Sequence, residues 1–247
     1  MDFTFLTREN APDLAYRQFT GKDSLPTVIF CGGFRSDMEG TKAAFLDEAC
    51  RKRGQSYIRF DYRGHGKSQR AFKDGTIGLW LEDTLAIIDM LSKGKIILVG
   101  SSMGGWISLL ATIKRKERVQ GLIGLAAAPD FTREIRDLMN PQQHTQMNKD
   151  GYCLVPSDYG EPYPITAALI EDGENHILLE REILIDCPVR LIQGMKDTDV
   201  AWQTAHRISN ALHTQDKKVY LREEGDHRLS TPEDLALLDK LIVELSA

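Results

Sequence analysis

Short apolar runs alternate with helix-length segments along most of this chain, and this alternation limits the folds that are open to it. Six runs rich in β-branched residues end in glycine or polar turns, such as TVIFCGGF at residues 27–34 and KIILVGSS at 95–102. Runs of this length are typical of strands that are buried on both faces. Segments with helical spacing lie between them, at residues 41–53, 76–91, 103–114 and 202–212. The alternation predicts an α/β fold with a mostly parallel sheet and helices on both of its faces.

Both ends of the chain carry clear local patterns as well. Residues 3–7 and 14–19 have the sequences FTFLT and LAYRQF, and we expect them to form a hairpin at the edge of the sheet. Near the other end, Thr231 can cap a helix, Pro232 fits its first turn, and leucine or isoleucine recurs along one face as far as Ile242. This pattern predicts a long amphipathic last helix.

One region interrupts the rhythm, between residues 131 and 186. It is rich in polar residues and contains prolines at positions 141, 156, 162 and 164. Because a structureless loop of this length is improbable inside a compact domain, we expect a small cap inserted over the carboxyl-terminal edge of the sheet, with a short helix at residues 165–172. The chain is then a single domain of residues 1–247, long enough to bury one sizeable core.

Charge and hydropathy disfavour several classes of partner. The net charge is −5, and the most basic run, KRKER at residues 114–118, falls where a helix should end, a position that favours cations. We therefore expect no nucleic-acid partner. No apolar run approaches the roughly 18–20 residues that span a bilayer, and the first residues, MDFTFLTREN, lack the pattern of a signal peptide. We expect no stable membrane insertion and a cytoplasmic location.

The cysteines stand at positions 31, 50, 153 and 187, widely spaced and without a CxxC pair. We expect free thiols rather than disulfides or a zinc site, and neither a metal nor an organic cofactor. Cys31 adjoins a glycine-rich loop, where it is either a thiol that senses oxidants or a buried and inert small residue. Burial is the simpler interpretation. The sequence leaves the oligomeric state open.

Two adjacent serines stand where a predicted strand meets a predicted helix. The residues Gly100 to Gly104 fit the pattern G-x-S-x-G, which in this context forms a nucleophile elbow. The turn is so sharp that its middle residue, Ser102, takes a strained backbone conformation and exposes its hydroxyl above the sheet. Ser101 is then a small buried spacer. The alternative is a glycine-rich turn without a catalytic role.

A serine hydroxyl needs a base, and the expected order along the chain is serine, acid, histidine. Of the six histidines, His227 fits best, because it follows the last predicted strand and precedes the last helix. His65 is the rival, but it precedes the serine and lies between glycines in a turn. The other histidines lie in the expected cap or on a helix with charged neighbours.

The acid should follow the strand VRLIQG, in the loop GMKDTDV at residues 194–200. Asp197 and Asp199 both lie there. We prefer Asp197 as the carboxylate that holds the tautomer of His227 and stabilises its charged form. Asp199 lies nearer to the next helix and is better placed to cap it. Ser102, His227 and Asp197 would then form a catalytic triad.

An oxyanion hole needs backbone donors. One is the N–H of the residue after the nucleophile, Met103, and the other should come from the loop after the third strand, FCGGFRSD at residues 30–37. There Gly32 and Gly33 let the backbone pass close to a substrate, which makes the N–H of Phe34 the second candidate. An ordinary glycine turn is the alternative.

The stretch DYRGHGKS at residues 61–68 ends like a phosphate-binding loop. The full pattern requires a glycine at the position where Asp61 stands. The match therefore fails, which disfavours nucleotide hydrolysis.

Together these motifs resemble those of the α/β-hydrolase superfamily. They run through nearly the whole chain and comprise Gly32-Gly33-Phe34, residues 61–68, residues 100–104, the Asp197 loop and His227. Many members have His-Gly in place of Gly32-Gly33, a difference that keeps the backbone donor but alters the floor of the site. The stretches GGFRSDMEGTKA, SSMGGW, CPVRLIQGMKD and DHRLS are similar to the branch that contains palmitoyl-protein thioesterases, acyl-glucuronide esterases and bacterial carboxylesterase-like relatives.

The resemblance implies a serine hydrolase that cleaves carboxylic esters or thioesters of small acyl molecules or acyl-proteins through an acyl-enzyme intermediate. Alternatives on the same fold are a C–C bond hydrolase, an acyl-peptide hydrolase and a non-catalytic ligand-binding protein. A dehalogenase or an epoxide hydrolase normally has a carboxylate where Ser102 stands. In the expected cap, Ile165, Leu169 and Leu178 either line an acyl pocket or only pack the cap on the sheet.

Overall fold

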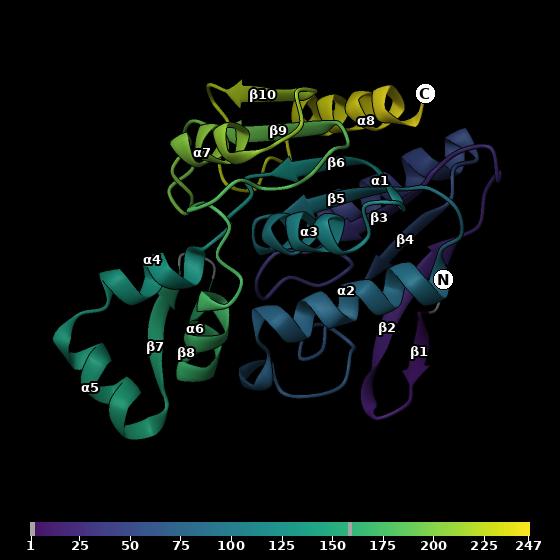
Figure 1. The fold of residues 1–247 in the computed structure, drawn as a ribbon. Coiled ribbons are helices and arrows are strands. Elements are labelled where there is room, and N and C mark those ends of the chain that lie inside the picture. The colour runs from purple at the N-terminus through teal and green to yellow at the C-terminus, as the bar shows by residue number, and fades with distance from the viewer. Residues whose placement is uncertain (1–2, 158–159) are drawn as a thin grey trace.

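The residues that the computed structural model describes, 3–157 and 160–247, form an eight-stranded sheet with helices around it (Figure 1). The strands are β1 (Thr4–Arg8), β2 (Ala11–Phe19), β3 (Thr27–Cys31), β4 (Tyr57–Phe60), β5 (Ile96–Ser101), β6 (Val119–Leu125), β9 (Val189–Gly194) and β10 (Lys217–Arg222). Their order in the sheet is β1-β2-β4-β3-β5-β6-β9-β10. β1 and β2 pair antiparallel as the predicted edge hairpin, β2 is antiparallel to β4, and the pairs from β4 to β10 are parallel.

Helices cover both faces of this sheet. α1 (Thr41–Arg53) and α8 (Pro232–Ser246) pack on one face, and α2 (Ile77–Leu91), α3 (Met103–Lys114) and α7 (Gln203–Ala211) contribute to the core on the other. Every residue of β3, β4, β5 and β9 is buried as a result. The predicted α/β fold with a mostly parallel sheet is confirmed.

The ends of the helices follow local signals in the sequence. Thr76 caps α2 by accepting a hydrogen bond from the N–H of Leu79. Thr231 and Asp234 form a reciprocal capping box at the start of α8. α1 ends at Gly54, whose φ of 67° is accessible to glycine without strain.

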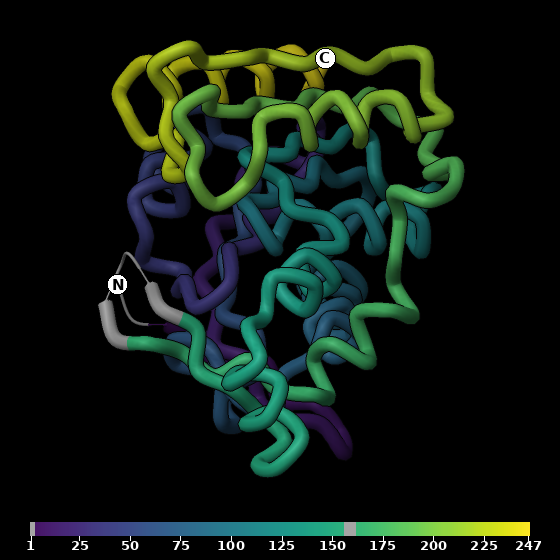
Figure 2. The backbone as a smooth tube through the Cα atoms, turned by 90° about the vertical axis from the view of Figure 1, so that its left-hand side faces the viewer, coloured from purple at the N-terminus to yellow at the C-terminus, as the bar shows by residue number. Residues whose placement is uncertain are grey.

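Residues 131–186, called the inserted segment below, follow β6 after a connection formed by residues 126–130. They contain α4 (Phe131–Leu138), α5 (Pro141–Asp150), the antiparallel pair β7 (Tyr152–Ser157) and β8 (Gly160–Thr166), and α6 (Ala167–Glu174). In the view turned by 90°, the part of the segment from α4 to α6 lies below β9, β10 and α7 (Figure 2). The helix predicted at residues 165–172 begins later than expected, because Ile165 pairs with Cys153 in the β7–β8 hairpin and Thr166 caps α6.

Four hydrogen bonds fasten the inserted segment to the body of the protein. The carboxylate of Asp130 accepts the N–H groups of Leu178 and Leu179, both at 2.9 Å. The indole N–H of Trp106 donates to the carbonyl oxygen of His176 at 3.0 Å. The N–H of Gly78 donates to the carboxylate of Asp172 at 2.7 Å. The segment is therefore anchored to the connection after β6, to α3 and to the start of α2.

Within the part of the chain that the structure describes, no helix combines the length and the apolar character that crossing a bilayer requires. The cysteines at 31, 50, 153 and 187 are all free thiols. Burial raises the pKa of Cys31 to about 11, although hydrogen bonds with Ser108 and Tyr62 act in the opposite direction. The thiol therefore stays protonated at neutral pH, which agrees with the interpretation of Cys31 as a buried and inert residue.

Candidate active site

Ser102 stands between β5 and α3, at the junction where the sequence predicts an elbow. Its backbone has φ 54° and ψ −119°, a conformation that non-glycine residues rarely adopt. Its N–H donates to the carbonyl oxygen of Leu125 at 2.9 Å, and its own carbonyl accepts from Gly105 and Ala128. The strained turn is thus held by backbone hydrogen bonds on both sides. Ser101 is the buried last residue of β5.

The two glycines of the motif are needed because backbone atoms approach them closely. A Cβ at Gly100 would lie 2.3 Å from the carbonyl oxygen of Gly104, and a Cβ at Gly104 would lie 2.1 Å from that of Cys31. A side chain at either position would push α3 away from the sheet. Because glycine has no side chain, β5 and α3 can approach each other, and Ser102 lies at the start of α3. There the first N–H groups of the helix have no intrahelical acceptor.

His227 and Asp197 come together from the loops after β10 and β9. Nδ1 of His227 lies 2.9 Å from Oδ2 and 3.1 Å from Oδ1 of Asp197. The Asp197 side chain is fully buried, whereas 18% of the His227 side chain is exposed. A buried carboxylate therefore holds one ring nitrogen of a histidine whose ring still reaches solvent.

Other donors fix the carboxylate of Asp197. Oδ1 accepts the backbone N–H groups of Asp199 and Val200 at 2.9 and 2.8 Å, and Oδ2 accepts Nε2 of Gln193 at 2.8 Å. Burial acts to raise the pKa of Asp197, but the hydrogen bonds from His227 and the two backbone amides outweigh burial and lower this pKa below its ordinary value. The carboxyl group is therefore ionised at neutral pH.

The structure separates the two candidate acids. Nδ1 of His227 is 4.0 Å from Oδ2 of Asp199, and 36% of the Asp199 side chain is exposed. The expected capping role of Asp199 is wrong, because α7 begins only at Gln203 and its N-cap residue, Trp202, makes no side-chain cap. Of the two carboxylates, Asp197 is the one that makes the short contact with the histidine.

The glycine loop after β3 passes beside Ser102. A Cβ at Gly33 would lie 3.4 Å from both Cβ of Ser102 and the carbonyl oxygen of Ser101. Phe34 follows at this point of close approach, and Met103 is the fully buried first residue of α3. Gly33, which precedes the candidate donor Phe34, thus lies against Ser102, and the other candidate, Met103, directly follows Ser102 in the chain.

The ring of Phe34 lies in a cluster of aromatic side chains. Its centroid is 4.8 Å from that of Phe72, 5.8 Å from Trp80, and 5.6 Å from both Phe131 and Tyr163. Phe131 and Tyr163 belong to the inserted segment. Edge-to-face contacts of this kind add to the stabilisation from burial, so the cluster ties the loop after β3 to the inserted segment.

Residues 61–68 fold around the carboxylate of Asp61. Oδ1 accepts the N–H of Met38 at 2.7 Å, and Oδ2 accepts the N–H of Lys67 at 2.8 Å. A Cβ at Gly66 would lie 2.1 Å from Oδ2. The carboxylate thus takes up one of the amide groups that a phosphate-binding loop would offer to a nucleotide, which agrees with the failed motif match. His65, the rival base, is buried in this turn.

The predicted pocket residues Ile165, Leu169 and Leu178 are all buried, with exposed fractions of 0%, 3% and 2%. They belong to the same hydrophobic core as Met103, and Phe34 packs against that core. Packing of the inserted segment on the body accounts for their burial.

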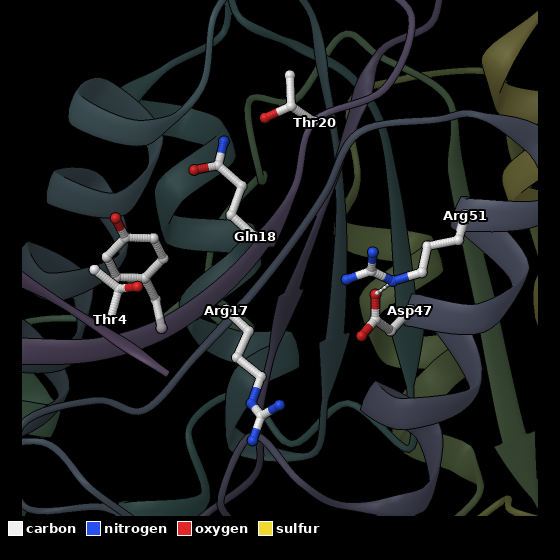
Figure 3. A pocket seen from close by; sticks show the side chains of 7 residues that line it. Thr4, Arg17, Gln18, Thr20, Asp47 and Arg51 are labelled. Carbon is white, nitrogen blue, oxygen red and sulfur yellow. Dashed lines mark hydrogen bonds and ion pairs between the residues drawn. The ribbon is translucent and has the colours of Figure 1, made fainter. Parts of the chain in front are cut away.

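The cavity in Figure 3 lies elsewhere, among β1, β2 and α1. Its volume is about 260 Å³, and its lining residues are Thr4, Tyr16, Arg17, Gln18, Thr20, Asp47 and Arg51. Both arginines already have acidic partners: Nε of Arg51 lies 2.7 Å from Oδ1 of Asp47, and Nε of Arg17 lies 2.8 Å from Oε1 of Glu39. None of the candidate catalytic residues borders this cavity.

Asp197, Asp199 and His227 also lie close enough together to suggest metal ligands, since one atom of each falls within 4.8 Å of the others. However, the donors described above occupy both oxygens of Asp197, and His227 is one of those donors. A cation would have to displace these hydrogen bonds. The arrangement of these three residues is therefore more typical of a carboxylate that orients a histidine than of a metal site.

Comparison with known proteins agrees with this geometry. Residues 26–152, just over half of the chain, match the family model described as alpha/beta hydrolase fold. The chain belongs to the alpha/beta hydrolase family. The mitochondrial palmitoyl-protein thioesterase ABHD10 of Bos taurus is 40% identical over 98% of this chain and 81% of its own length.

Solved structures of other alpha/beta hydrolases superpose on nearly the whole chain. Alpha/beta hydrolase domain-containing protein 10 from mouse has a TM-score of 0.91 and 38% identity, covering 99% of this chain and 98% of its own. Est1E from Butyrivibrio proteoclasticus has a TM-score of 0.80 over 98% of this chain and 96% of its own, and at 20% identity this likeness concerns the fold alone. The expected membership of the family is confirmed, and this alpha/beta hydrolase is an enzyme of the esterase or thioesterase type.

The expected cytoplasmic location is contradicted. The relatives from Bos taurus, Pongo abelii and Homo sapiens are named as mitochondrial proteins. The expectation rested on the absence of targeting features in this sequence, and such an absence does not identify a compartment.

Proposed function

We propose that this alpha/beta hydrolase cleaves carboxylic esters or thioesters of acyl substrates through a catalytic triad of Ser102, His227 and Asp197. The observation that carries the proposal is the contact of Nδ1 of His227 with a buried, ionised Asp197. Asp197 accepts a hydrogen bond from the N–H at Nδ1, which keeps the proton on that nitrogen and leaves Nε2 unprotonated and able to act as a base. Ser102 supplies the nucleophile, since its backbone is held in a rarely adopted conformation between β5 and α3, and such strain is common where a side chain has a functional role.

In the acylation step, Oγ of Ser102 attacks the acyl carbonyl carbon while Nε2 of His227 takes the hydroxyl proton. The carbonyl oxygen becomes an oxyanion, for which the backbone N–H groups of Phe34 and Met103 are the proposed donors. The negative charge of Asp197 stabilises the imidazolium ion that forms on His227. The tetrahedral intermediate then collapses, and the C–O or C–S bond to the leaving group breaks.

The imidazolium of His227 gives its proton to the leaving alcohol or thiol, so the histidine is neutral again. A water molecule then attacks the acyl-enzyme, with Nε2 of His227 taking a proton from it. The same oxyanion donors stabilise the second tetrahedral intermediate. Collapse releases the carboxylic acid and returns the proton to Oγ of Ser102.

We propose acyl-protein thioesters or small acyl esters as substrates, because ABHD10 relatives are named palmitoyl-protein thioesterases. In this proposal the inserted segment is a cap on a single domain of residues 1–247, and Ile165, Leu169 and Leu178 border the space for the acyl group. Their shared core with Met103 supports the last point.

Two neighbouring variants test the proposal. Ser102→Ala should lower kcat/KM for p-nitrophenyl butyrate and for a butyryl thioester by roughly 10³-fold or more. Ser101→Ala is the matched control and should keep most of the activity, because its hydroxyl is buried beside the elbow. Unfolding by urea confirms that both variants are folded. An inactive Ser101→Ala beside an active Ser102→Ala would place the nucleophile one residue earlier and refute the assignment.

A further inference from the structure

His65 is a buried histidine that the proposed chemistry does not use. Only 3% of its surface is exposed. Its ring packs between aromatic side chains, with centroids 5.6 Å from Tyr62, 5.1 Å from Phe72 and 5.2 Å from Trp80. A polar ring held among apolar ones needs hydrogen-bond partners for both of its nitrogens.

Both nitrogens of His65 have partners, and these partners fix its tautomer. Nε2 lies 3.1 Å from the backbone nitrogen of Arg35, which is a donor, so Nε2 accepts. Nδ1 lies 3.3 Å from the carbonyl oxygen of Arg63, which is an acceptor, so Nδ1 carries the proton. A second proton on Nε2 would face the N–H of Arg35 and break the first contact. Burial also lowers the pKa of His65 to about 4, in agreement with a neutral ring.

The contact with Arg35 falls at a strained point of the chain. Arg35 has a φ of 58°, in the left-handed region that non-glycine residues avoid. It directly follows Phe34, whose N–H is the proposed oxyanion donor, and Gly33, the residue before Phe34, lies against Ser102. A left-handed residue beside a functional loop persists only when its surroundings hold it there.

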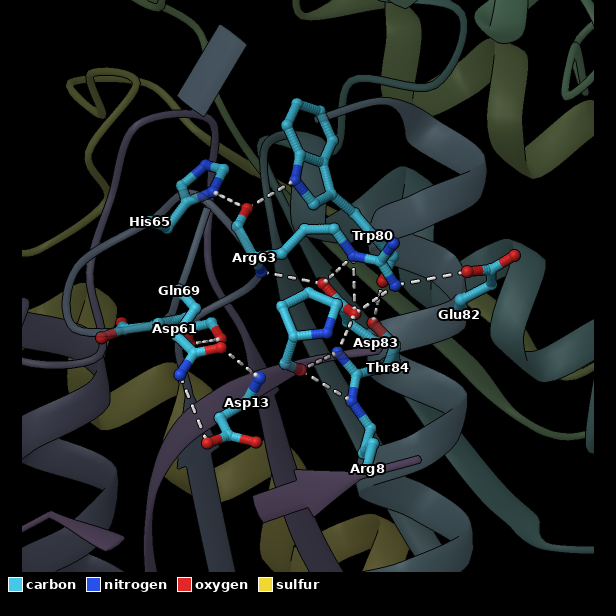
Figure 4. A network of polar contacts seen from close by, with 12 residues as sticks. Arg8, Asp13, Asp61, Arg63, His65, Gln69, Trp80, Glu82, Asp83 and Thr84 are labelled. Carbon is cyan, nitrogen blue, oxygen red and sulfur yellow. Dashed lines mark hydrogen bonds and ion pairs between the residues drawn. The ribbon is translucent and has the colours of Figure 1, made fainter. Parts of the chain in front are cut away.

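The other side of the His65 ring is anchored in a buried ionic network (Figure 4). The carbonyl oxygen of Arg63 also accepts the indole N–H of Trp80 at 3.1 Å. The backbone N–H of Arg63 donates to Asp83 at 2.8 Å, and its guanidinium donates to the same carboxylate at 2.7 and 2.9 Å. Arg8 joins this fully buried carboxylate at 2.9 Å. His65 thus links the loop beside Ser102 to a rigid part of the core.

We propose that His65 is a positioning residue for the oxyanion hole: its neutral ring spans from the carbonyl of Arg63 to the N–H of Arg35 and so holds the N–H of Phe34 in the direction that the oxyanion needs. This inference rests on the serine-hydrolase function proposed above. A neutral imidazole suits the task because it accepts on one side of a rigid ring and donates on the other.

Two substitutions separate positioning from packing. His65→Phe keeps an aromatic ring in the cluster but removes both hydrogen bonds, and His65→Gln offers an acceptor and a donor again. We expect His65→Phe to lower kcat for p-nitrophenyl butyrate by about 10- to 100-fold with KM changed far less, since losing an oxyanion donor outright costs about 10²–10³. The affinity for a trifluoromethyl ketone, which forms an oxyanion with the serine, should fall by the same factor as kcat/KM. His65→Gln should recover a substantial part of both.

The tautomer can be tested in the unchanged protein by ¹⁵N spectra of the histidine side chains at neutral pH. We expect His65 to be neutral, with the proton on Nδ1. A charged ring or a proton on Nε2 overturns the inference whether or not the variants fold. So does a His65→Phe variant with full kcat and full ketone affinity, or a His65→Gln variant as impaired as His65→Phe. If Ser102→Ala remains active, the proposed function fails; if it is inactive while His65→Phe is normal, only the role of His65 fails.

Discussion

Replacing Asp197 by asparagine exchanges one carboxylate oxygen for an NH₂ group in the proposed triad. The surrounding contacts predict how this exchange changes the protonation of His227. The backbone amides of Asp199 and Val200 donate to Oδ1, and Gln193 donates to Oδ2. An asparagine keeps both backbone hydrogen bonds only if its oxygen stays on the Oδ1 side. Its NH₂ group then takes the place of Oδ2, which lies 2.9 Å from Nδ1 of His227.

In that orientation the new amide donates to Nδ1, so the proton of His227 moves to Nε2. Nε2 is the nitrogen that must accept the proton of Ser102, and the base is lost. We expect kcat to fall by about 10⁴-fold, which corresponds to roughly 5 kcal/mol of transition-state stabilisation. The effect on folding should be smaller, about 1 kcal/mol, because Oε1 of Gln193 is buried without a partner in the described part of the chain. Gln193 can turn its amide and accept from the new NH₂ group, at the cost of the longer contacts of its Nε2 with the carbonyl oxygens of Gly194 at 3.4 Å and Val200 at 3.3 Å.

The assay is the turnover of p-nitrophenyl butyrate, with unfolding by urea to separate catalysis from stability. Asp199→Asn is the matched control, because its carboxylate is 4.0 Å from Nδ1 of His227 and partly exposed. We expect this control to change kcat by less than about threefold and the free energy of unfolding by less than about 0.5 kcal/mol. Equal losses in the two variants would rule out the specific role of Asp197, as would an Asp197→Asn enzyme that keeps more than about a tenth of kcat.

Two further predictions concern the inserted segment and the loop of His227. Leu169 is 3% exposed, so Leu169→Ala should lower the free energy of unfolding by about 2–5 kcal/mol and also lower kcat/KM for octanoyl esters relative to acetyl esters. Leu138→Ala, at a position with 84% exposure, is the control. If Leu169→Ala leaves the ratio of octanoyl to acetyl activity unchanged, Leu169 has only a packing role. Lys42 donates to the carbonyl oxygen of Arg228, and burial lowers its pKa from 10.5 to about 8. Between about pH 8 and pH 10.5, Lys42 is therefore mostly neutral in the folded protein but still protonated in the unfolded chain. The free energy of unfolding of the wild type, minus that of Lys42→Met, should then rise as the pH increases from about 8 to about 10.5. Urea unfolding at several pH values measures this difference, and a flat or falling difference would contradict it.

The parts of the fold that could be predicted from the sequence are those fixed by local patterns. β5 and α3 flank the glycine motif at the expected residues, and α1 runs from Thr41 to Arg53 as its spacing predicts. α5 was missed although Asn140, Pro141 and Gln143 form a capping box with proline in the first turn. These residues were visible as a helix start, but the polar composition of the region favoured an irregular interpretation.

Other features depend on contacts between distant parts of the chain. The contact of His65 with Arg35 joins two loops, and the flanking glycines of His65 gave no sign of it. Asp197 makes the short contact with His227, whereas its role as the catalytic acid stays a prediction. The capping argument that set Asp199 aside was wrong. The hydrogen-bond partners of a carboxylate in a loop depend on the path of the backbone. The positions of Asp197 and Asp199 in the sequence do not show that path.

We propose that Ser102 is the residue that becomes acylated, and the site of modification by a fluorophosphonate probe shows whether it is. The probe reacts covalently with a serine only where a base and an oxyanion hole activate it. After trypsin digestion, the peptide that follows Lys95 contains both Ser101 and Ser102, so fragmentation in the mass spectrometer must locate the added mass. We expect a single adduct on Ser102 that disappears in His227→Ala and persists in Ser101→Ala. An adduct on Ser101, on another residue, or on Ser102 with undiminished rate in His227→Ala would contradict it.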